Sequence, residues 1–392
     1  MVKGVQFSAA ASGIKAGAGE LDLGLVFFSE PAPVAALYTR NSVKAAHILY
    51  NTQRAQGRVR ALLVNSGCAN ACTGRVGVED LAFIAGRLAG LLAIRQEEIL
   101  FASTGVIGKR LPVETMTAAL PGLVAKLGEK NLDVFAHAIM TTDTYPKIVE
   151  EALPGGTHRV AGAAKGAGMM NPLFATMLAF VFTDYPLDAM RLKRMLPALG
   201  RQSFERISVD GDTSTNDTVL LFSTGSGTAA GGSGGAGTGY HTAAVKAAIG
   251  RVMKALALLV VKDGEGASKV IHLTVKGAAS THAAERIARR IAASPLVKTA
   301  FFGCDPNWGR IIAAAGDAGV PIRPRQVEIA IQGERLARHG VEVPFIEEEM
   351  KKLMDSREIE LVVNLHDGRA AYDMYTCDLT YDYVRINASY RT

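Results

Sequence analysis

Hydrophobic and polar positions along this chain repeat with two different periods. Short runs rich in β-branched and aromatic residues predict strands at 61–65, 178–184, 218–223, 272–275, 327–331 and 359–365. Between these runs, apolar residues recur every three or four positions, which predicts helices with one buried face. We expect those faces at Leu81, Ile84, Leu88 and Leu91, at Ala244, Ala247, Ile249 and Val252, and at Ala284, Ile287, Ala288 and Ile291. The two patterns together predict sheets covered by helices.

Length, composition and charge narrow the class of protein. The 392 residues exceed one ordinary hydrophobic core, so we expect two domains, or one large and one small. Because 48% of the residues are hydrophobic, the 41 glycines indicate tight turns rather than disorder. The net charge of +6 is modest and the basic residues are scattered, which argues against nucleic-acid binding but permits a small anionic ligand. The densest basic run, 286–290, is interpreted as a solvated helix face.

Cysteines and histidines argue against a disulfide framework or a metal centre. The four cysteines form no CxxC pair, so free thiols in a reducing compartment are expected. None of the eight histidines has metal-ligand spacing, and no Ser-His-Asp order is visible. The opening segment lacks the apolar run of a secretory signal, and no stretch reaches membrane-spanning length. These features predict a soluble, cytoplasmic protein.

Residues 224–239 are low in sequence complexity and are interpreted as a surface loop. They contain matches to GxSxG and to GxGxxG. A nucleophile elbow or a dinucleotide-binding loop needs a strand before it and a helix directly after it, so both matches are interpreted as chance.

Several segments are unusually rich in hydroxyl, amide and glycine residues: 65–74, 102–108, 141–147 and 207–218. Backbone amides in Ser/Thr-Gly turns can converge on one point and form an anion or oxyanion pocket, although plain turns are the alternative. Helix capping explains some of these side chains but not all of them. A calcium loop is disfavoured because the aspartates do not have EF-hand spacing.

Two other turns keep more than one interpretation. Glu265 lies between two glycines, where a carboxylate can orient an amine or belong to an exposed turn. Trp308, the one tryptophan of the chain, lies in GCDPNWGR and is interpreted as the apolar anchor of a tight turn.

The segment KGAGMMNPLFATMLAFVFTD, residues 165–184, places a threonine at the start of a predicted buried strand. A threonine hydroxyl is a weak nucleophile unless a base lies beside it, and its own α-amine can be that base when the residue begins a chain. Cleavage between Ala175 and Thr176 would free this amine, and the following strand would hold Thr176 rigidly. The alternative is a threonine that merely begins the strand.

The same segment resembles the autocleavage segment of the ornithine acetyltransferases, also called glutamate N-acetyltransferases, of arginine biosynthesis. NSGCANACTG, STGVIG, TTDTYPK, DGDTSTNDT, GEGASK, SPLVKTAFFGCDPNWGRI and TCDLTYDYVRINASYRT resemble that family in the same order, so the resemblance spans essentially the whole chain. It implies a layered α-β-β-α sandwich over residues 1–271 and a smaller C-terminal α/β domain over 272–392. The chain differs from the family's commoner pattern at Ala167, Leu173 and Phe174.

The resemblance also implies roles for particular residues. Thr176 matches the nucleophile, released by self-cleavage after Ala175 into chains 1–175 and 176–392. Thr104 and Gly105 match the oxyanion-stabilising pair. The substrate-contacting positions that match are Thr142, Lys165, Thr176, Glu265, Asn387 and Thr392.

The implied reaction is a two-step acyl transfer. Thr176 takes the acetyl group from N2-acetylornithine, ornithine leaves, and glutamate accepts the acetyl group to give N-acetylglutamate. No metal or redox cofactor is implied, and acetyl-CoA as a second donor stays open. Two copies of each fragment, a heterotetramer, are expected. The alternatives are an aminopeptidase or amidase of the same self-processing fold, with water as acceptor, and a non-enzymatic binding module.

Overall fold

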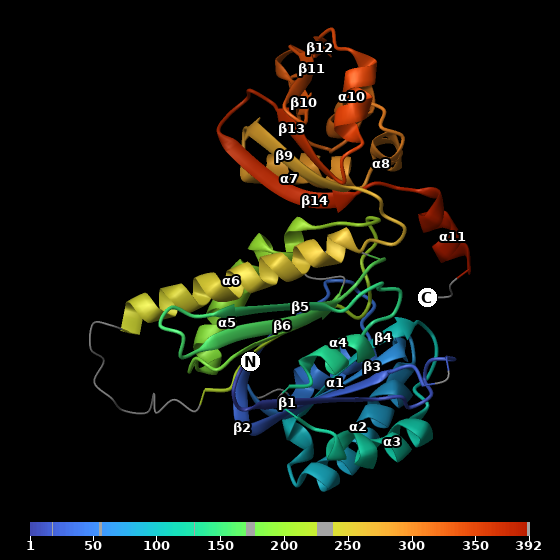
Figure 1. Ribbon diagram of the computed structural model, residues 1–392, viewed down its shortest axis with the longest axis vertical. Coiled ribbons are helices and arrows are strands. Elements are labelled where there is room, and N and C mark those ends of the chain that lie inside the picture. Colours follow the sequence, from blue (N-terminus) through green and yellow to red (C-terminus); the bar gives the residue numbers. More distant parts are fainter. Residues whose placement is uncertain (18, 55–56, 129, 170–176, 226–237, 390–392) are drawn as a thin grey trace.

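The computed structural model describes the chain except for residues 18, 55–56, 129, 170–176, 226–237 and 390–392. Its elements form two α/β units, and the smaller unit, which contains the later part of the chain, lies above the larger one in Figure 1. Among the described residues, no helix is both long enough and apolar enough to cross a bilayer.

The larger unit alternates strands and helices. Its strands are β1 (Val5–Ala10), β2 (Leu23–Tyr38), β3 (Arg58–Cys68), β4 (Ile99–Val106), β5 (Lys147–Ala152), β6 (Arg159–Lys165), β7 (Leu178–Thr183) and β8 (Thr218–Ser223). Its helices are α1 (Ala46–Arg54), α2 (Gly74–Leu92), α3 (Val113–Ala125), α4 (Leu132–Ala138), α5 (Ala189–Gln202) and α6 (Thr238–Lys262).

The strands follow the order β4-β3-β2-β8-β7-β6-β5, with β1 paired to β2. The long strand β2 joins two halves of this sheet. Its first part pairs with β1 and β3, whereas 34–38 pair with β8. The register between β2 and β3 shifts between Phe27 and Ala32, where the strand changes partners.

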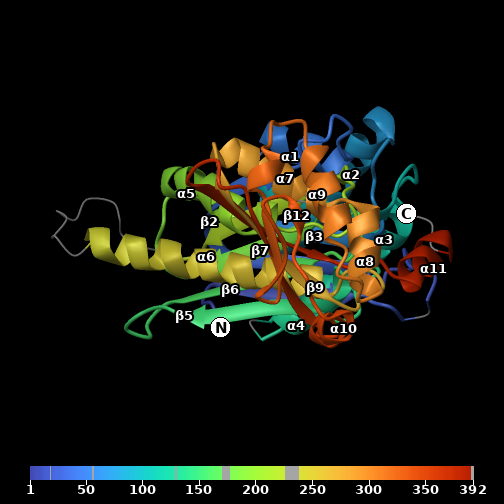
Figure 2. The same ribbon diagram turned by 90° about the horizontal axis from the view of Figure 1, so that it is seen from above.

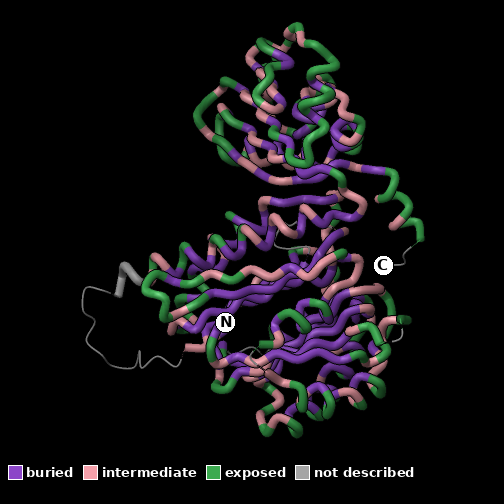
Figure 3. The backbone as a smooth tube through the Cα atoms, in the orientation of Figure 1, coloured by how far each residue is buried: buried purple, intermediate pink, exposed green. Residues whose placement is uncertain are grey.

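The two halves pack face to face and are covered by helices on their outer sides. Apolar side chains from β1 to β4 meet those from β6, β7 and β8 in one buried cluster. A second cluster joins the outer face of β3 and β4 to α1, α2 and α3, and a third joins β7 and β8 to α5 and α6. Figure 3 shows the buried strands as two layers between these helices. The predicted α-β-β-α sandwich is confirmed.

Strand β7 shows why the sequence folds into the middle of these layers. All six of its residues are buried, as expected for a strand that is covered on both faces. Leu178, Phe180 and Phe182 point toward the other half-sheet, whereas Ala179 and Val181 pack toward α5 and α6. The aromatic ring of Phe182 stacks on that of Phe222, with centroids 5.4 Å apart.

The smaller unit has a six-stranded sheet in the order β12-β11-β10-β13-β9-β14, seen from above in Figure 2. Its strands are β9 (Val270–Ala278), β10 (Glu328–Ile331), β11 (Glu334–Arg338), β12 (Val341–Glu342), β13 (Glu358–Asn364) and β14 (Ala370–Cys377). Its helices are α7 (Thr281–Ala292), α8 (Pro295–Phe302), α9 (Trp308–Gly316) and α10 (Glu347–Met354), and α11 (Tyr381–Ser389) follows β14. The expected boundary at residues 271 and 272 stays a prediction, and β9 already begins at Val270.

The predicted elements agree with the structure more closely than the predicted helix faces do. All six predicted strands coincide with observed strands to within a residue at each end or lie inside them. Ala284, Ile287, Ala288 and Ile291 are buried as expected. Two faces were partly wrong: Leu91 is 44% exposed, and Ala247 is exposed while its neighbours Val245 and Ala248 are buried.

The basic run 286–290 is also only partly solvated. Arg286 is exposed, but only 16% of the Arg289 side chain is, because it donates a hydrogen bond to the Tyr372 hydroxyl at 3.0 Å. All four cysteines lie in the described part of the chain and are free thiols, as predicted.

Candidate active site

Six of the nine residues singled out in the sequence line one cavity of about 220 Å³. They come from β4, the turn before β5, the end of β6, the turn after α6 and helix α11: Thr104, Gly105, Thr142, Lys165, Glu265 and Asn387. Met177, which directly follows Thr176 in the chain, lines the same cavity. Ala175, Thr176 and Thr392 lie outside the described residues, so their roles stay predictions.

A close approach of two strand ends positions Thr104 and Gly105. Strands β3 and β4 are parallel, and Gly67 pairs with Gly105. A Cβ atom on Gly105 would lie 2.3 Å from the carbonyl carbon of Gly67, and the φ of Gly105 is +126°. Both the contact and the backbone conformation exclude a larger residue. The β4 backbone therefore holds the Thr104 side chain at the cavity wall.

Lys165 ends β6 and is the positive charge among the described residues of the cavity lining. Its Nζ donates to Thr104 Oγ1 at 3.0 Å and to Thr141 Oγ1 at 2.8 Å. Burial lowers the pKa of the Lys165 ammonium, and Asp143 opposes that shift. Because Thr104 Oγ1 accepts the lysine bond, its own proton is free to be donated into the cavity.

Glu265 supplies a buried carboxylate to the same cavity. Its Oε2 accepts a hydrogen bond of 2.8 Å from Asn387 Nδ2, which brings α11 to the site. Gly168 makes room for this carboxylate, because a Cβ atom at that position would lie 2.3 Å from Oε2. Glu265 is 7% exposed, so the exposed-turn interpretation is wrong. A substrate with a carboxylate and an amine would meet Lys165 and Glu265 as opposite charges.

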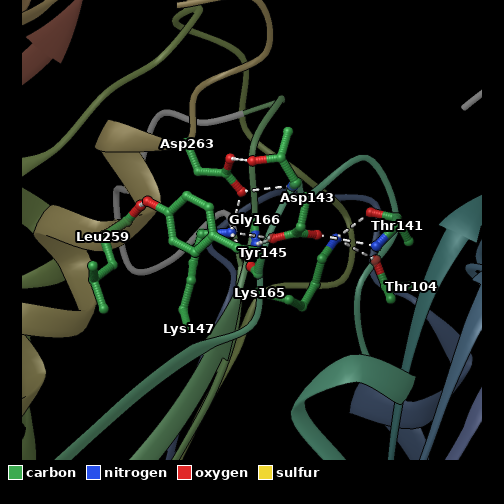
Figure 4. Close-up of polar contacts among 10 residues, drawn as sticks. Thr104, Thr141, Asp143, Tyr145, Lys147, Lys165, Gly166, Leu259 and Asp263 are labelled. Atoms are coloured by element: carbon green, nitrogen blue, oxygen red, sulfur yellow. Dashed lines mark hydrogen bonds and ion pairs between the residues drawn. The ribbon is translucent and has the colours of Figure 1, made fainter.

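Asp143 lies behind Lys165 in a set of buried polar contacts (Figure 4). Its Oδ1 accepts from Lys147 Nζ and from Gly166 N, each at 2.6 Å. Burial raises the pKa of Asp143, but the charges of Lys165 and Lys147 outweigh that effect and hold the pKa below its usual range. Asp143 therefore remains a carboxylate next to Lys165.

Asp217 is a further carboxyl group of the cavity, and its role could not be read from the sequence. It is 1% exposed, and its Oδ2 has no hydrogen-bond partner among the described residues. Burial raises the pKa of Asp217 well above its ordinary value. Asp217 directly precedes β8, and the amide of the next residue, Thr218, donates to the Met177 carbonyl at 2.9 Å. A carboxyl group with a raised pKa therefore directly precedes the residue that is hydrogen-bonded to Met177.

We predict that Asp217→Asn stabilises the fold at pH 8 and does so much less at pH 4. The unfolded chain ionises Asp217 above about pH 4, whereas the raised pKa delays its ionisation in the folded chain, so the wild type loses stability as pH rises above about 4. Each unit of raised pKa corresponds to about 1.4 kcal/mol. Thermal unfolding of both proteins from pH 4 to pH 8 checks this, and a difference in melting temperature that stays constant with pH would contradict it.

Buried His47 gives the stability of the fold a pH dependence opposite to that from Asp217. It is fully buried in α1, and its Nε2 lies 3.0 Å from Thr218 Oγ1. Burial lowers the pKa of His47 to about 3. Below about pH 6.5 the imidazole of His47 binds a proton in the unfolded chain but stays neutral in the folded chain. The free energy of unfolding therefore decreases as pH falls from 6.5 toward 3.

Replacing His47 with glutamine should therefore make the protein less sensitive to acid. Between pH 7 and pH 4 the variant is expected to lose about 3 kcal/mol less unfolding free energy than the wild type. Urea unfolding at both pH values measures this difference, and equal losses would show that other groups dominate the acid response.

Other contributing residues were missed, although the motifs that contain them were recognised. Thr141 was not distinguished from Thr142, yet it binds the Lys165 ammonium. Asn216 joins two segments by donating to the carbonyls of Ala69 at 2.6 Å and Ser103 at 2.7 Å. The density of hydroxyl and amide residues was the available signal, but it does not say which side chain points inward. Within the described ranges, no group of His, Cys, Asp and Glu is arranged to hold a metal ion.

Comparison with known proteins gives consistent matches along the whole chain. The model of the ArgJ family matches residues 6–392. A relative from Geobacter sulfurreducens, named arginine biosynthesis bifunctional protein ArgJ, is 46% identical over 396 residues and both chains are fully covered. A relative of the same name from Desulfotalea psychrophila is 44% identical with the same coverage. A solved structure of arginine biosynthesis bifunctional protein argJ from Bacillus halodurans is 40% identical, with a TM-score of 0.50, and covers 55% of this chain and 100% of its own.

Proposed function

Because the chain belongs to the ArgJ family and is an acyltransferase of arginine biosynthesis, we propose that it moves the acetyl group of N2-acetylornithine to L-glutamate through Thr176. The observation that carries this proposal is the cavity at the start of β7, where a hydroxyl donor, a lysine and a carboxylate converge beside Met177. The matches to the ArgJ family confirm the family and the class of enzyme that were inferred from the sequence. The residue roles are proposals.

The first half-reaction forms an acetyl-threonine. The α-amine of Thr176 takes the proton of its own hydroxyl, and Oγ1 attacks the acetyl carbonyl of N2-acetylornithine. Thr104, whose proton is free, and Gly105 stabilise the negative oxygen of the tetrahedral intermediate. The C–N bond then breaks and the ornithine amine leaves with the proton.

The second half-reaction reverses these steps with glutamate. Its amine attacks the acetyl-threonine, Thr176 regains its proton, and N-acetylglutamate leaves. Lys165 suits a substrate carboxylate and Glu265 a substrate amine, with Thr142 and Asn387 as further contacts. Thr392 is proposed as another contact on the family resemblance alone. This chemistry calls for no metal or redox cofactor, because the nucleophile, base and oxyanion donors are supplied by the chain. Acetyl-CoA is proposed as a second possible donor, in keeping with the bifunctional name of the relatives.

The threonine amine becomes free when the chain cuts itself between Ala175 and Thr176. The product 176–392 would contain about 55% of the chain, and the solved chain from Bacillus halodurans, matched over its full length, covers the same share. This agreement supports the cut. We further propose that two copies of each product assemble into a heterotetramer and that the enzyme works in the cytoplasm.

A mass-spectrometric assay with three arms tests the function. Purified protein receives N2-acetylornithine with glutamate, N2-acetylornithine alone, or acetyl-CoA with glutamate. We expect ornithine and N-acetylglutamate in equal amounts in the first arm. Ornithine and free acetate in the second arm, at the rate of the first, would instead identify an amidase. N-acetylglutamate in the third arm would establish acetyl-CoA as a donor.

A further inference from the structure

Three loops that line the cavity are joined behind it by four buried charged residues, here called the charge cluster: Asp143, Lys147, Lys165 and Asp263. Lys147, the first residue of β5, lies at its centre and is completely buried. Its Nζ lies 2.6 Å from Asp143 Oδ1 and 2.5 Å from Asp263 Oδ2. Lys147 does not line the cavity itself, so any effect it has on the substrate must act through other residues.

Asp143 links Lys147 to the lysine of the cavity. Besides the Lys147 ammonium, its Oδ1 accepts from the Gly166 amide, which follows Lys165 directly. Its Oδ2 accepts from the Thr141 amide at 3.0 Å, and the Thr141 hydroxyl accepts from Lys165 Nζ. Both carboxylate oxygens of Asp143 therefore receive backbone N–H groups from segments that hold Lys165.

Asp263 links Lys147 to the carboxylate of the cavity. It follows the last residue of α6 and lies two positions before Glu265. Its Oδ2 accepts from the Thr144 amide at 3.0 Å, and its Oδ1 accepts from the Thr144 hydroxyl. The Glu265 amide in turn donates to the Ala167 carbonyl at 2.9 Å, so the turn after α6 also contacts the segment after Lys165.

We propose that Lys147 is a positioning residue for acetyl transfer, because by binding Asp143 and Asp263 together it sets the separation between Lys165 and Glu265. The inference rests on the proposed function, in which these two side chains hold the substrate's charged groups. Small displacements of groups that orient a substrate reduce the rate strongly, by about 100-fold for 1 Å. Figure 4 shows Lys147 between the two aspartates, with Lys165 on the far side of Asp143.

The two aspartates differ in a way that makes the proposal testable. An amide at position 263 retains its contacts, because the Thr144 hydroxyl can accept from the new NH₂ group while the amide oxygen accepts from the Thr144 amide. An amide at position 143 cannot, because both oxygens of Asp143 face N–H donors. Removing one charge of a buried pair leaves the other uncompensated, which is strongly unfavourable. Asp263→Asn should therefore compensate for the loss of Lys147, and Asp143→Asn should not.

The test compares steady-state kinetics of acetyl transfer in the full chain for Lys147→Met and for its double variants with Asp263→Asn and with Asp143→Asn. Lys147→Met is expected to raise KM for both N2-acetylornithine and glutamate and to lower kcat/KM about 10- to 100-fold. The double variant with Asp263→Asn should recover to within about threefold of the wild type, and the other double variant should not recover. Lys262→Met is the matched control, because Lys262 lies next to Asp263 but pairs with Glu358 at the surface.

Each outcome bears on the inference. Wild-type KM values in Lys147→Met, or equal recovery in the two double variants, would overturn it. A lower melting temperature with unchanged KM would show that Lys147 serves stability alone. If Lys147→Met does not fold, the single variants decide, because Asp143→Asn should lose at least about tenfold more kcat/KM than Asp263→Asn. A failure of the proposed function can be told apart from a failure of this inference, because the wild type itself would then transfer no acetyl group.

Discussion

Replacing Thr176 with alanine is expected to abolish acetyl transfer and to leave the 41.4 kDa chain uncut. Without the hydroxyl, no oxygen can attack the carbonyl of Ala175 during maturation or the acetyl carbonyl of the substrate. Loss of a catalytic nucleophile lowers kcat by roughly 10⁴-fold or more, so the residual rate should equal background. Denaturing mass spectrometry and the acetylornithine assay measure the two effects on the same preparation.

Two companion variants show whether both effects belong to this hydroxyl. Thr176→Ser keeps a hydroxyl and an amine and should still cut and transfer, although more slowly. Thr157→Ala removes a hydroxyl from an exposed turn, where it donates a hydrogen bond to the Gly155 carbonyl two residues earlier, and should behave as the wild type. A cut chain in Thr176→Ala, or transfer at the wild-type rate, would mean that the nucleophile is another residue.

Replacing Thr104 with valine is expected to lower kcat by about 10²- to 10³-fold, the usual loss when one oxyanion donor is removed. Valine has nearly the shape of threonine, so the close packing of β4 against β3 should survive. Lys165 keeps Thr141 as an acceptor, so substrate binding and KM should change much less than kcat. Steady-state kinetics with N2-acetylornithine as the varied substrate separate the two constants.

Thr104→Ser is the matched control for this prediction, because it restores the donor without the methyl group. Its kcat should return to within about tenfold of the wild type, since the hydrogen bond to the negative oxygen is then recovered. Melting temperatures of the three proteins should agree closely. A valine variant that loses only KM would assign Thr104 to substrate binding, and one that keeps the wild-type kcat would remove it from the oxyanion site.

The sequence predicted those parts of the fold and of the site that show up as a pattern within a short segment of the chain. Gly105 was part of a recognisable motif because its position excludes a side chain, so the residue type itself signals the backbone requirement. Buried strands such as 178–183 were equally readable, since a run covered on both faces must be apolar throughout. These features place the strand ends that form the cavity.

Features that depend on contacts between residues far apart in the chain could not be predicted from the sequence. Lys147 and Asp263 are 116 positions apart, and nothing in the spacing of either residue indicates the other. Asp217 belongs to a motif with eight polar residues, DGDTSTNDT, and its burial follows only from the packing of β8 beside β7. The face of α6 was partly misjudged because alanine is a weak hydrophobic signal that fits either side of a helix.

The strand order has a consequence for what self-cleavage would leave behind. Residues before the proposed cut supply β4, β3 and β2 at one side of the sheet and β6 and β5 at the other, while β8 and β7 between them come from residues after it. The strands of the second product would thus lie between strands of the first. They would be hydrogen-bonded to it on both sides, through the β2–β8 and β6–β7 pairings. Neither product would contain all the strands of the larger unit's sheet, and a separated product would expose unpaired strand edges, which favour aggregation. The two products of one precursor would therefore stay associated while folded, and products of different precursor molecules would not exchange.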